Sequence, residues 1–334
     1  QFCGGETIDG CESTIQELEK AKIGTILDYS VEGEESEKSF QKTKEEILKT
    51  IRKSAENPAI PFAVFKVTGI FKAELLEKAQ TEAPLTDEEQ ELFDHSKELL
   101  VEICALAYQL KVRLFIDAEE SWIQTTIDRL TYEMMERYNQ ETAIIYNTFQ
   151  MYRHDMLGNL KEAISAAQEK NYLLGVKLVR GAYLEKERQK AHEDEYSEPL
   201  HVCKEDTDRD YDLGVEVCLK NVDCVHFCMG THNEASCLRL CDAMNALQIP
   251  ANHPNIYFAQ LLGMSDNISY NLAASGYNVA KYVPYGPVDA VMPYLFRRAE
   301  ENSSIAGQTS REFALLQKEV NRRNNAWKIT AISC

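Results

Sequence analysis

The sequence predicts a (β/α)8 barrel, and three observations lead to this prediction. Short apolar runs rich in β-branched residues recur eight times along the 334 residues, and longer amphipathic stretches separate them. Strands that alternate with helices favour a parallel sheet joined by crossover helices. The runs are apolar almost throughout, as expected for strands covered on both faces. Eight such units need about 250 residues before insertions, fewer than the chain has.

The elements follow one another in a regular order. The predicted strands are Gly24–Ser30, Ala63–Gly69, Arg113–Glu119, Ala143–Gln150, Gly175–Gly181, Asp223–Thr231, Asn255–Gly263 and Tyr277–Tyr285. The spacing of apolar residues predicts helices at Glu35–Glu56, Asp87–Lys111, Ser121–Asn139, Met156–Glu169, Asp206–Asn221, Asn233–Leu247 and Ser265–Ala274. We expect a helix that begins at Pro287, a last charged helix over about Ser310–Arg323, and helical or loop insertions in the first twenty or so residues and in Phe71–Thr86.

We expect three segments: a helical or loop extension over residues 1–22, the barrel over residues 23–304, and a helix and tail over residues 305–334. An open doubly wound sheet is the alternative fold, but no G-x-G-x-x-G follows the first strand. The chain begins at Gln1 rather than Met, so we expect a fragment or a processed product.

Composition narrows the function. A formal net charge of −18 argues against binding to nucleic acid or to an anionic membrane surface. No apolar run approaches the ~20 residues that span a bilayer. The ten cysteines form no paired C-x-x-C zinc signature. Cys224 and Cys228 flank His226, which permits a metal site, but buried free thiols in a reducing compartment are the simpler interpretation. We therefore expect an intracellular protein without a metal ion.

Polar residues gather at the C-terminal ends of the predicted strands, where barrels of this kind carry their active sites. Each one alone has a structural explanation, such as a buried ion pair or a helix cap. Together they indicate a site, because charged side chains are costly to bury. They include Asp28, Lys66, Asp117, Thr148, Gln150, Lys177, Arg180, His232, Asn233, Gln260, Tyr282 and Tyr285.

Two adjacent arginines, Arg297 and Arg298, share one helix face with Tyr294. Paired guanidiniums match a carboxylate well, so with Lys66 they suit a small carboxylate ligand, with Tyr282 and Tyr294 as its apolar wall. The alternative is that the arginines neutralise the helix dipole and pair with an acidic residue such as Glu301. A second set suits a larger cofactor with phosphates: Gln150, Lys177, Arg180, the Gly181-Ala182 backbone, His232 and Asn233.

Seven motifs occur in one order: Lys66-Val-Thr-Gly69, Asp117-Ala-Glu-Glu120, Thr148-Phe-Gln-Met-Tyr152, Lys177-Leu-Val-Arg-Gly-Ala-Tyr183, Gly230-Thr-His-Asn-Glu234, Gln260-Leu-Leu-Gly-Met264 and the helix with Tyr294, Arg297 and Arg298. In this order they strongly resemble the monofunctional, eukaryotic-like branch of the proline dehydrogenase family, over about Ile23–Ser304. The resemblance implies a distorted (β/α)8 (TIM) barrel with extra helices. It also implies FAD bound noncovalently over the strand ends, under a roof formed by the arginine helix.

The activity that the resemblance implies is the first step of proline catabolism. L-Proline is oxidised to 1-pyrroline-5-carboxylate by hydride transfer to flavin N5, and the electrons pass to a quinone. A hydroxyproline dehydrogenase of the same family is the alternative, although relatives that prefer hydroxyproline tend to have a smaller residue where Tyr282 stands. The resemblance also implies transient contact with a separate pyrroline-5-carboxylate dehydrogenase. It places the protein in the cytoplasm, peripheral at the inner membrane, or alternatively in the mitochondrion.

Residue roles also carry over by resemblance. Arg297, Arg298 and Lys66 correspond to a carboxylate clamp, and Glu301 to an acidic partner that gates the site. Asp117 is expected to orient Lys66 or Tyr282. The residues that pack on the substrate ring correspond to Leu261, Tyr282 and Tyr294. The flavin contacts correspond to Asp117, Ala118, Thr148, Gln150, Lys177, Arg180, Gly181, Ala182, Tyr183, His232 and Asn233. Bacterial bifunctional relatives tend to carry Arg where Lys177 stands, so the contact to flavin N5 stays open.

Two other functions fit the residues alone. Lys66 suits a barrel aldolase that forms a Schiff base with a carbonyl substrate. A non-catalytic scaffold that binds a flavin or an amino acid is the third class.

Overall fold

The computed structural model describes residues 2–30, 35–81, 83–289 and 291–292, with residues 296, 317–318, 320 and 322. Its centre is a closed barrel of eight strands in the order β1-β2-β3-β4-β5-β6-β7-β8, all neighbours parallel. The strands are β1 (Ile23–Tyr29), β2 (Phe62–Lys66), β3 (Arg113–Asp117), β4 (Ile145–Gln150), β5 (Leu174–Val179), β6 (Val225–Gly230), β7 (Ile256–Leu261) and β8 (Val279–Tyr285). The predicted fold is therefore confirmed.

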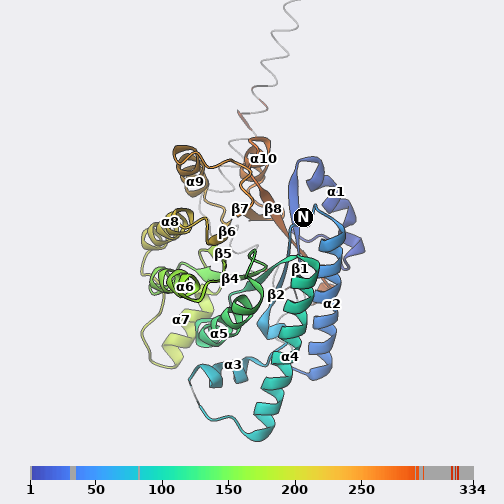
Figure 1. The fold of residues 1–334 in the computed structure, drawn as a ribbon, viewed down its shortest axis with the longest axis vertical. Helices are drawn as coiled ribbons and strands as arrows, with labels where there is room; N and C mark the ends of the chain where they lie inside the picture. Colours follow the sequence, from blue (N-terminus) through green and yellow to red (C-terminus); the bar gives the residue numbers. More distant parts are fainter. Residues whose placement is uncertain are drawn as a thin grey trace, which may run out of the picture.

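The helices surround the barrel on its outside (Figure 1). They are α1 (Glu12–Lys20), α2 (Glu37–Glu56), α3 (Ala73–Gln80), α4 (Asp87–Leu110), α5 (Ser121–Tyr138), α6 (Met156–Lys170), α7 (Leu184–Glu193), α8 (Lys204–Lys220), α9 (Glu234–Ala246) and α10 (Asp266–Ala274). Short 3-10 helices occur at η1 (Asp9–Cys11) and η2 (Val67–Gly69). The helix expected over Ser310–Arg323 lies almost wholly outside the described residues.

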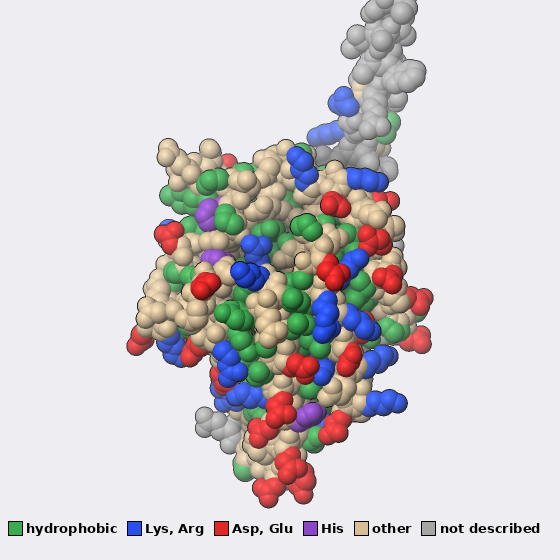
Figure 2. All heavy atoms as spheres, turned by 45° about the vertical axis from the view of Figure 1, so that its right-hand side comes forward, with side chains coloured by type: hydrophobic (Ala, Val, Ile, Leu, Met, Phe, Trp, Pro, Cys, Tyr) green, Lys and Arg blue, Asp and Glu red, His purple; other side chains and the backbone are tan. Residues whose placement is uncertain are grey.

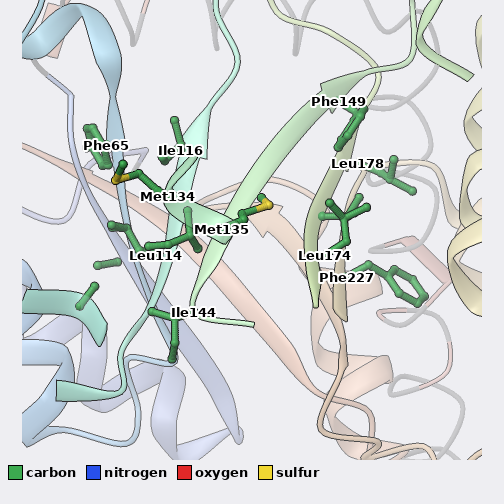
Figure 3. Packing of buried hydrophobic residues seen from close by; sticks show 14 of the residues in the cluster. Phe65, Leu114, Ile116, Met134, Met135, Ile144, Phe149, Leu174, Leu178 and Phe227 are labelled. Atoms are coloured by element: carbon green, nitrogen blue, oxygen red, sulfur yellow. The ribbon is translucent and has the colours of Figure 1, made fainter. Parts of the chain in front are cut away.

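Alternation along each strand divides the core into two layers. In β2, Phe62 and Val64 belong to a cluster inside the barrel, whereas Ala63 and Phe65 pack in the larger cluster between strands and helices. Figure 3 shows part of the outer layer, where Met134 and Met135 of α5 lie among Leu114, Ile116 and Ile144. The inner cluster consists of Ile26, Phe62, Val64, Phe115, Ala143, Tyr146, Cys228, Ala259, Ala280 and Tyr282. Because aromatic rings fill the lumen, polar side chains have room only at its ends.

Two long helices begin at sequence signals that the structure uses. Ser36 and Ser39 form a reciprocal capping box at the start of α2, and Thr86 and Glu89 form another at the start of α4. Each box satisfies backbone N–H groups that have no partner within the helix. These caps fix the starts of the two helices that cover β2 and β3.

The N-terminal residues pack against the first and last strands. Gly4 N–H donates to the carbonyl oxygen of Pro284 at 2.9 Å, next to the end of β8. The side chains of Ile15 and Leu18 on α1 are buried in the outer core. This segment therefore extends the hydrophobic layer rather than forming a separate unit.

The surface of the described residues carries mixed charges, with Lys and Arg lying among Asp and Glu on the face drawn in Figure 2. No helix in this part of the chain is long and apolar enough to cross a membrane. The nine cysteines that the structure describes are free thiols. Over the same residues, no group of three or more His, Cys, Asp or Glu side chains is placed to hold a metal ion.

Candidate active site

A buried carboxylate between two lysines lies at the C-terminal mouth of the barrel. Asp117, the last residue of β3, accepts a hydrogen bond from Lys66 Nζ at 2.9 Å and another from Lys177 Nζ. Lys66 ends β2 in register with Asp117, and Lys177 comes from β5. The three side chains are at most 11% exposed. Two cations and one anion leave a formal charge of +1 on this Lys66–Asp117–Lys177 cluster, which suits an anionic ligand.

The environment of Asp117 keeps it ionised. Burial by itself would raise the pKa of its carboxyl group. The charges of Lys177 and Lys66, with their hydrogen bonds, outweigh burial and lower the pKa to about 2. Asp117 is therefore an anion at neutral pH and holds both ammonium groups in place.

Tyr282 of β8 closes the cluster on its apolar side. Lys177 Nζ donates to the Tyr282 hydroxyl at 2.6 Å and lies 4.8 Å from the centre of its ring. The ring stacks on Phe115 at 6.4 Å between centres, and Leu261 of β7 is in register with Tyr282. Asp117 was expected to orient Lys66 or Tyr282. It bonds directly to Lys66, and it is linked to Tyr282 through Lys177.

A second buried carboxyl group, from Glu119, was given no role by the sequence analysis. Its Oε1 accepts from the backbone N–H of Thr68 at 3.0 Å, and its Oε2 accepts from the Thr68 hydroxyl at 2.5 Å. Burial raises the pKa of Glu119 to about 7, against the lowering effects of the Lys66 charge and the Thr68 hydrogen bonds. β3 ends at Asp117, so strand alternation does not extend to Glu119 and no sequence signal marks it as buried.

The side chain of Gln150, at the end of β4, joins the loops after two other strands. Its Nε2 donates to the carbonyl oxygen of Glu119 at 2.7 Å, and its Oε1 accepts from Ala182 N–H at 3.0 Å. Thr148, also on β4, donates from its hydroxyl to the carbonyl oxygen of Ile116 at 2.8 Å. These bonds use the polar groups of both side chains to fix the barrel mouth.

Arg180 follows β5 and is held by three partners. Its guanidinium donates to Asp208 Oδ1 at 2.6 Å, to the Thr231 hydroxyl at 2.6 Å and to the Ser236 hydroxyl at 3.0 Å. It also lies 4.2 Å from the ring centre of Tyr211. The side chain keeps 22% exposure, so a fixed cation faces the space above the loop.

Gly181 is required where it stands. Its φ of +148° is unfavourable for residues with a Cβ, and an added Cβ would meet the ring of Tyr152 at 2.4 Å. Its neighbour Ala182 is half-buried, next to the buried Tyr183. A side chain at position 181 would therefore have to displace the Tyr152 ring that packs against this loop.

His232 and Asn233 link β6 to α9. His232 Nδ1 and the Ser265 hydroxyl are 3.0 Å apart, within hydrogen-bonding distance. Asn233 caps α9 by accepting from Ser236 N–H at 3.2 Å, which is the structural explanation considered for this residue.

Lys281 of β8 fixes the neighbouring loop from the outer side of the barrel. Its ammonium is fully buried and donates to the carbonyl oxygens of Leu261 and Met264 and to Asp266 Oδ1 at 2.8 Å. This loop also carries Ser265. Sequence reasoning gave Lys281 no role, because a lysine in an apolar strand shows no sign of which layer it faces.

Comparisons with known proteins show the family of the chain. A family model described as proline dehydrogenase matches residues 11–311, most of the chain. The chain belongs to the proline dehydrogenase family. Proline dehydrogenase 1, mitochondrial, from Dictyostelium discoideum is 34% identical over 97% of this chain, and the match spans 64% of that relative's length. Hydroxyproline dehydrogenase from Xenopus laevis is 30% identical over 97% of this chain and 77% of its own length.

Solved structures agree on the fold. A crystal structure of proline utilization A from Bdellovibrio bacteriovorus, inactivated by N-propargylglycine, aligns with a TM-score of 0.81 at 22% identity. The alignment covers 91% of this chain and 32% of that one. At 22% identity, this likeness shows that the two chains share the barrel fold.

The structure gathers most of the predicted site residues at one mouth of the proline dehydrogenase barrel. Four of them lie outside the described residues: Tyr294, Arg297, Arg298 and Glu301. The remaining predicted residues lie in the C-terminal half of a strand or just beyond a strand end, except Tyr282, which is in the middle of β8.

Proposed function

We propose that this chain oxidises L-proline to 1-pyrroline-5-carboxylate with FAD as its cofactor. The observation that carries the proposal is the Lys66–Asp117–Lys177 cluster beside Tyr282, at the barrel mouth of a proline dehydrogenase family member. The cluster offers net positive charge next to an apolar wall. Proline presents the complementary pair, a carboxylate on an apolar ring.

The substrate is held by charge and by shape. Lys66 would hold the carboxylate, and Tyr282 and Leu261 would pack on the ring. Positive charge at the same mouth favours the neutral form of the ring amine, which is the form that can lose hydride. Arg297 and Arg298 are proposed to complete the carboxylate clamp, with Tyr294 on the ring and Glu301 as the gating partner.

The described residues fit FAD at the loops after β5 and β6. Arg180 supplies a fixed, partly exposed cation, and Gly181, which has no side chain, lets the loop after β5 pack against the Tyr152 ring. The N-terminus of α9 adds a positive dipole end, which favours phosphate groups. Ala118, Thr148, Gln150, Ala182, Tyr183, His232 and Asn233 are proposed as further contacts. When bound, FAD supplies the redox chemistry by accepting the hydride from the proline ring.

The residues around Lys177 act by positioning. Asp117 and Tyr282 hold its ammonium in one place, so no reorganisation is needed when charge changes beside it. A fixed cation stabilises negative charge that develops nearby. We propose that this is the main electrostatic contribution of the barrel to the reaction.

Hydroxyproline is the second candidate substrate. The Xenopus laevis relative, matched over 77% of its length, is named hydroxyproline dehydrogenase. Tyr282 argues against it, because its buried ring and its bond to Lys177 fill the wall where an extra hydroxyl would need room. The ratio of kcat/KM for L-proline to that for 4-hydroxyproline decides between them. A ratio well above one supports proline, and a ratio below one makes the chain a hydroxyproline dehydrogenase.

We further propose a quinone as the electron acceptor and transient contact with a pyrroline-5-carboxylate dehydrogenase. A mitochondrial location is favoured over a cytoplasmic one, because the Dictyostelium relative is named as mitochondrial. Reduction of a soluble quinone analogue by the protein in the presence of L-proline would support a quinone as the electron acceptor.

Turnover of L-proline with an artificial electron acceptor tests the activity. Proline-dependent reduction of the acceptor supports the proposal. Flavin retained without turnover of any cyclic amine indicates a binding scaffold instead. Borohydride treatment with a carbonyl substrate tests the aldolase alternative. A Schiff base at Lys66 would be reduced to a stable adduct, which would add mass to the protein.

A further inference from the structure

Two successive pairs of residues join the segment at the end of β2 to the segment at the end of β3. Lys66 is bonded to Asp117, and two residues further along each segment Thr68 is bonded to Glu119. β2 ends at Lys66 and β3 at Asp117, so Thr68 and Glu119 lie directly beyond the two strands, at the same mouth of the barrel as the Lys66–Asp117–Lys177 cluster. The Lys66 charge acts on the Glu119 carboxyl group.

The contacts of Glu119 suit both its charged and its neutral form. Thr68 N–H donates to Oε1 in either state. The Thr68 hydroxyl donates to a carboxylate at Oε2 but accepts from a carboxylic acid there, because a hydroxyl can do both. Among the described residues, no lysine or arginine forms an ion pair with Glu119. A buried carboxyl group with neutral partners gains and loses a proton more readily than one with a fixed counter-ion.

We propose that binding of the substrate carboxylate beside Lys66 is coupled to proton uptake by Glu119. Glu119 is then a positioning residue for the substrate, acting through the charge of Lys66. With Glu119 ionised, the cluster and Glu119 together carry no net formal charge. With Glu119 protonated they carry +1, which favours an anion. This inference rests on the proposed function, in which a proline carboxylate binds at Lys66.

The sign of the coupling follows from linkage. An anion bound next to Glu119 makes the charged form of Glu119 less favourable, so binding raises its pKa. By reciprocity, protonation of Glu119 strengthens binding of the anion. The carboxylate should therefore bind more tightly below the pKa of free Glu119 than above it.

The other groups that face Glu119 are mostly neutral. Gln124 of α5 accepts from the Glu119 N–H, and Gln150 of β4 donates to its carbonyl oxygen. The charged neighbours are Lys66 on β2 and Glu120, which is itself paired with Lys186 of α7. Glu187 of α7 is a further buried acid, bonded to Ser121 at the start of α5. Glu187 therefore serves as the control.

Calorimetric titration of the flavin-loaded full chain with cyclopentanecarboxylate tests the coupling. This probe carries the carboxylate on an apolar ring but no amine, so its own titration does not interfere between about pH 6 and about pH 9. In the wild-type protein its affinity should fall by about fivefold or more over this range. Titrations near pH 7.5 in buffers of different ionisation enthalpy should show uptake of a fraction of a proton per carboxylate bound.

The isosteric change Glu119→Gln should abolish both the proton uptake and the pH dependence. Glu187→Gln should leave them as in the wild-type protein. Thr68→Val removes a donor to the charged form of Glu119, so it should move the midpoint of the pH dependence to higher pH.

Proton uptake that persists in Glu119→Gln, or affinity independent of pH in the wild-type protein, would overturn the coupling. Either result would leave proline oxidation itself intact. Failure of the proposed function has a different signature, namely a flavin-loaded protein that neither binds the cyclic carboxylate nor oxidises proline. A midpoint that does not move in Thr68→Val also contradicts the coupling, and it does not depend on the Glu119 variant being stable.

Discussion

Asp117 bridges two buried lysines, so its replacement tests the cluster most directly. Asp117→Asn leaves two cations buried without a counter-charge, and we expect the free energy of unfolding to fall by about 3 kcal/mol. Urea unfolding measures this change. The matched control is Asp94→Asn on the exposed face of α4, which should stay within about 0.5 kcal/mol of wild type. Equal stability of the two variants would contradict the buried ion-pair account.

Tyr282→Phe keeps the ring and removes only the hydroxyl that binds Lys177. Loss of one hydrogen bond to a charged group costs about 1.5 kcal/mol, so kcat/KM for L-proline should fall by about tenfold. The same change at Tyr270, which is 45% exposed on α10, is the control and should leave kcat/KM unchanged. An unaltered kcat/KM in Tyr282→Phe would remove the hydroxyl from the proposed mechanism.

Site residues could be predicted from the sequence where a polar side chain stands in an otherwise apolar strand. Lys66, Asp117 and Tyr282 are polar residues in apolar runs, and the structure brings them together with Lys177. Glu119 could not be assigned, because the sequence does not show which of two adjacent acids is buried. Glu119 is buried against Thr68, whereas its neighbour Glu120 pairs with Lys186.

Single side chains also tie the strand ends of this barrel into one rim. Gln150 joins the loop after β3 to the loop after β5. Gln150→Met keeps the length of the side chain but leaves two backbone groups without partners, at a cost of about 2 kcal/mol. We expect lower stability and faster loss of flavin, measured by unfolding and by flavin fluorescence after dilution.

The control for that prediction is Gln90→Met on α4, where the exposed side chain donates to Asp94 Oδ1. Gln90→Met should retain flavin as the wild-type protein does. If Gln150→Met also retained it at wild-type stability, the rim would have no part in holding the cofactor.

Secondary structure was predictable because burial imposes a clear period on most elements. Every strand begins within two residues of its predicted start, and the expected end of β2 differs by three because η2 takes over at Val67. Helix α7 was missed, since Leu184–Glu193 is mostly charged and buries only Glu187 and Ala191. Without an apolar stripe, a surface helix leaves no periodic signal.

The whole molecule combines two carboxyl groups with opposite pH effects. The pKa of Asp117 is lowered from 3.8 to about 2, so its contribution to stability is present above pH 3.8 and is lost as pH falls through 2. The pKa of Glu119 is raised from 4.5 to about 7, so its contribution is present below pH 4.5 and is lost as pH rises through 7. Together these two groups favour the folded state most near pH 4.

Denaturant unfolding at about pH 5 and about pH 8 tests the Glu119 part of this balance. The wild-type protein should lose about 2 kcal/mol more than Glu119→Gln over this interval, from the size of the pKa shift. Parallel pH profiles of the two proteins would show that Glu119 does not titrate between these limits.

The register that closes the barrel lay beyond the sequence pattern. β1 and β8 pair in parallel over Ile23–Tyr29 and Val279–Tyr285, and this long-range register has no local signal. The count of strand–helix units predicted closure, since eight units favour a barrel. The arginine helix, the first clue to a carboxylate ligand, has Arg297 and Arg298 outside the described residues, so its place over the mouth stays a prediction.

Anaerobic titration of the purified, flavin-loaded protein with L-proline tests the central claim most directly. If the Lys66–Asp117–Lys177 cluster positions proline for hydride loss, L-proline should bleach the visible absorption of the flavin. The variant Lys66→Met should need much more proline for the same bleaching. A flavin spectrum that stays unchanged at saturating L-proline would contradict the account.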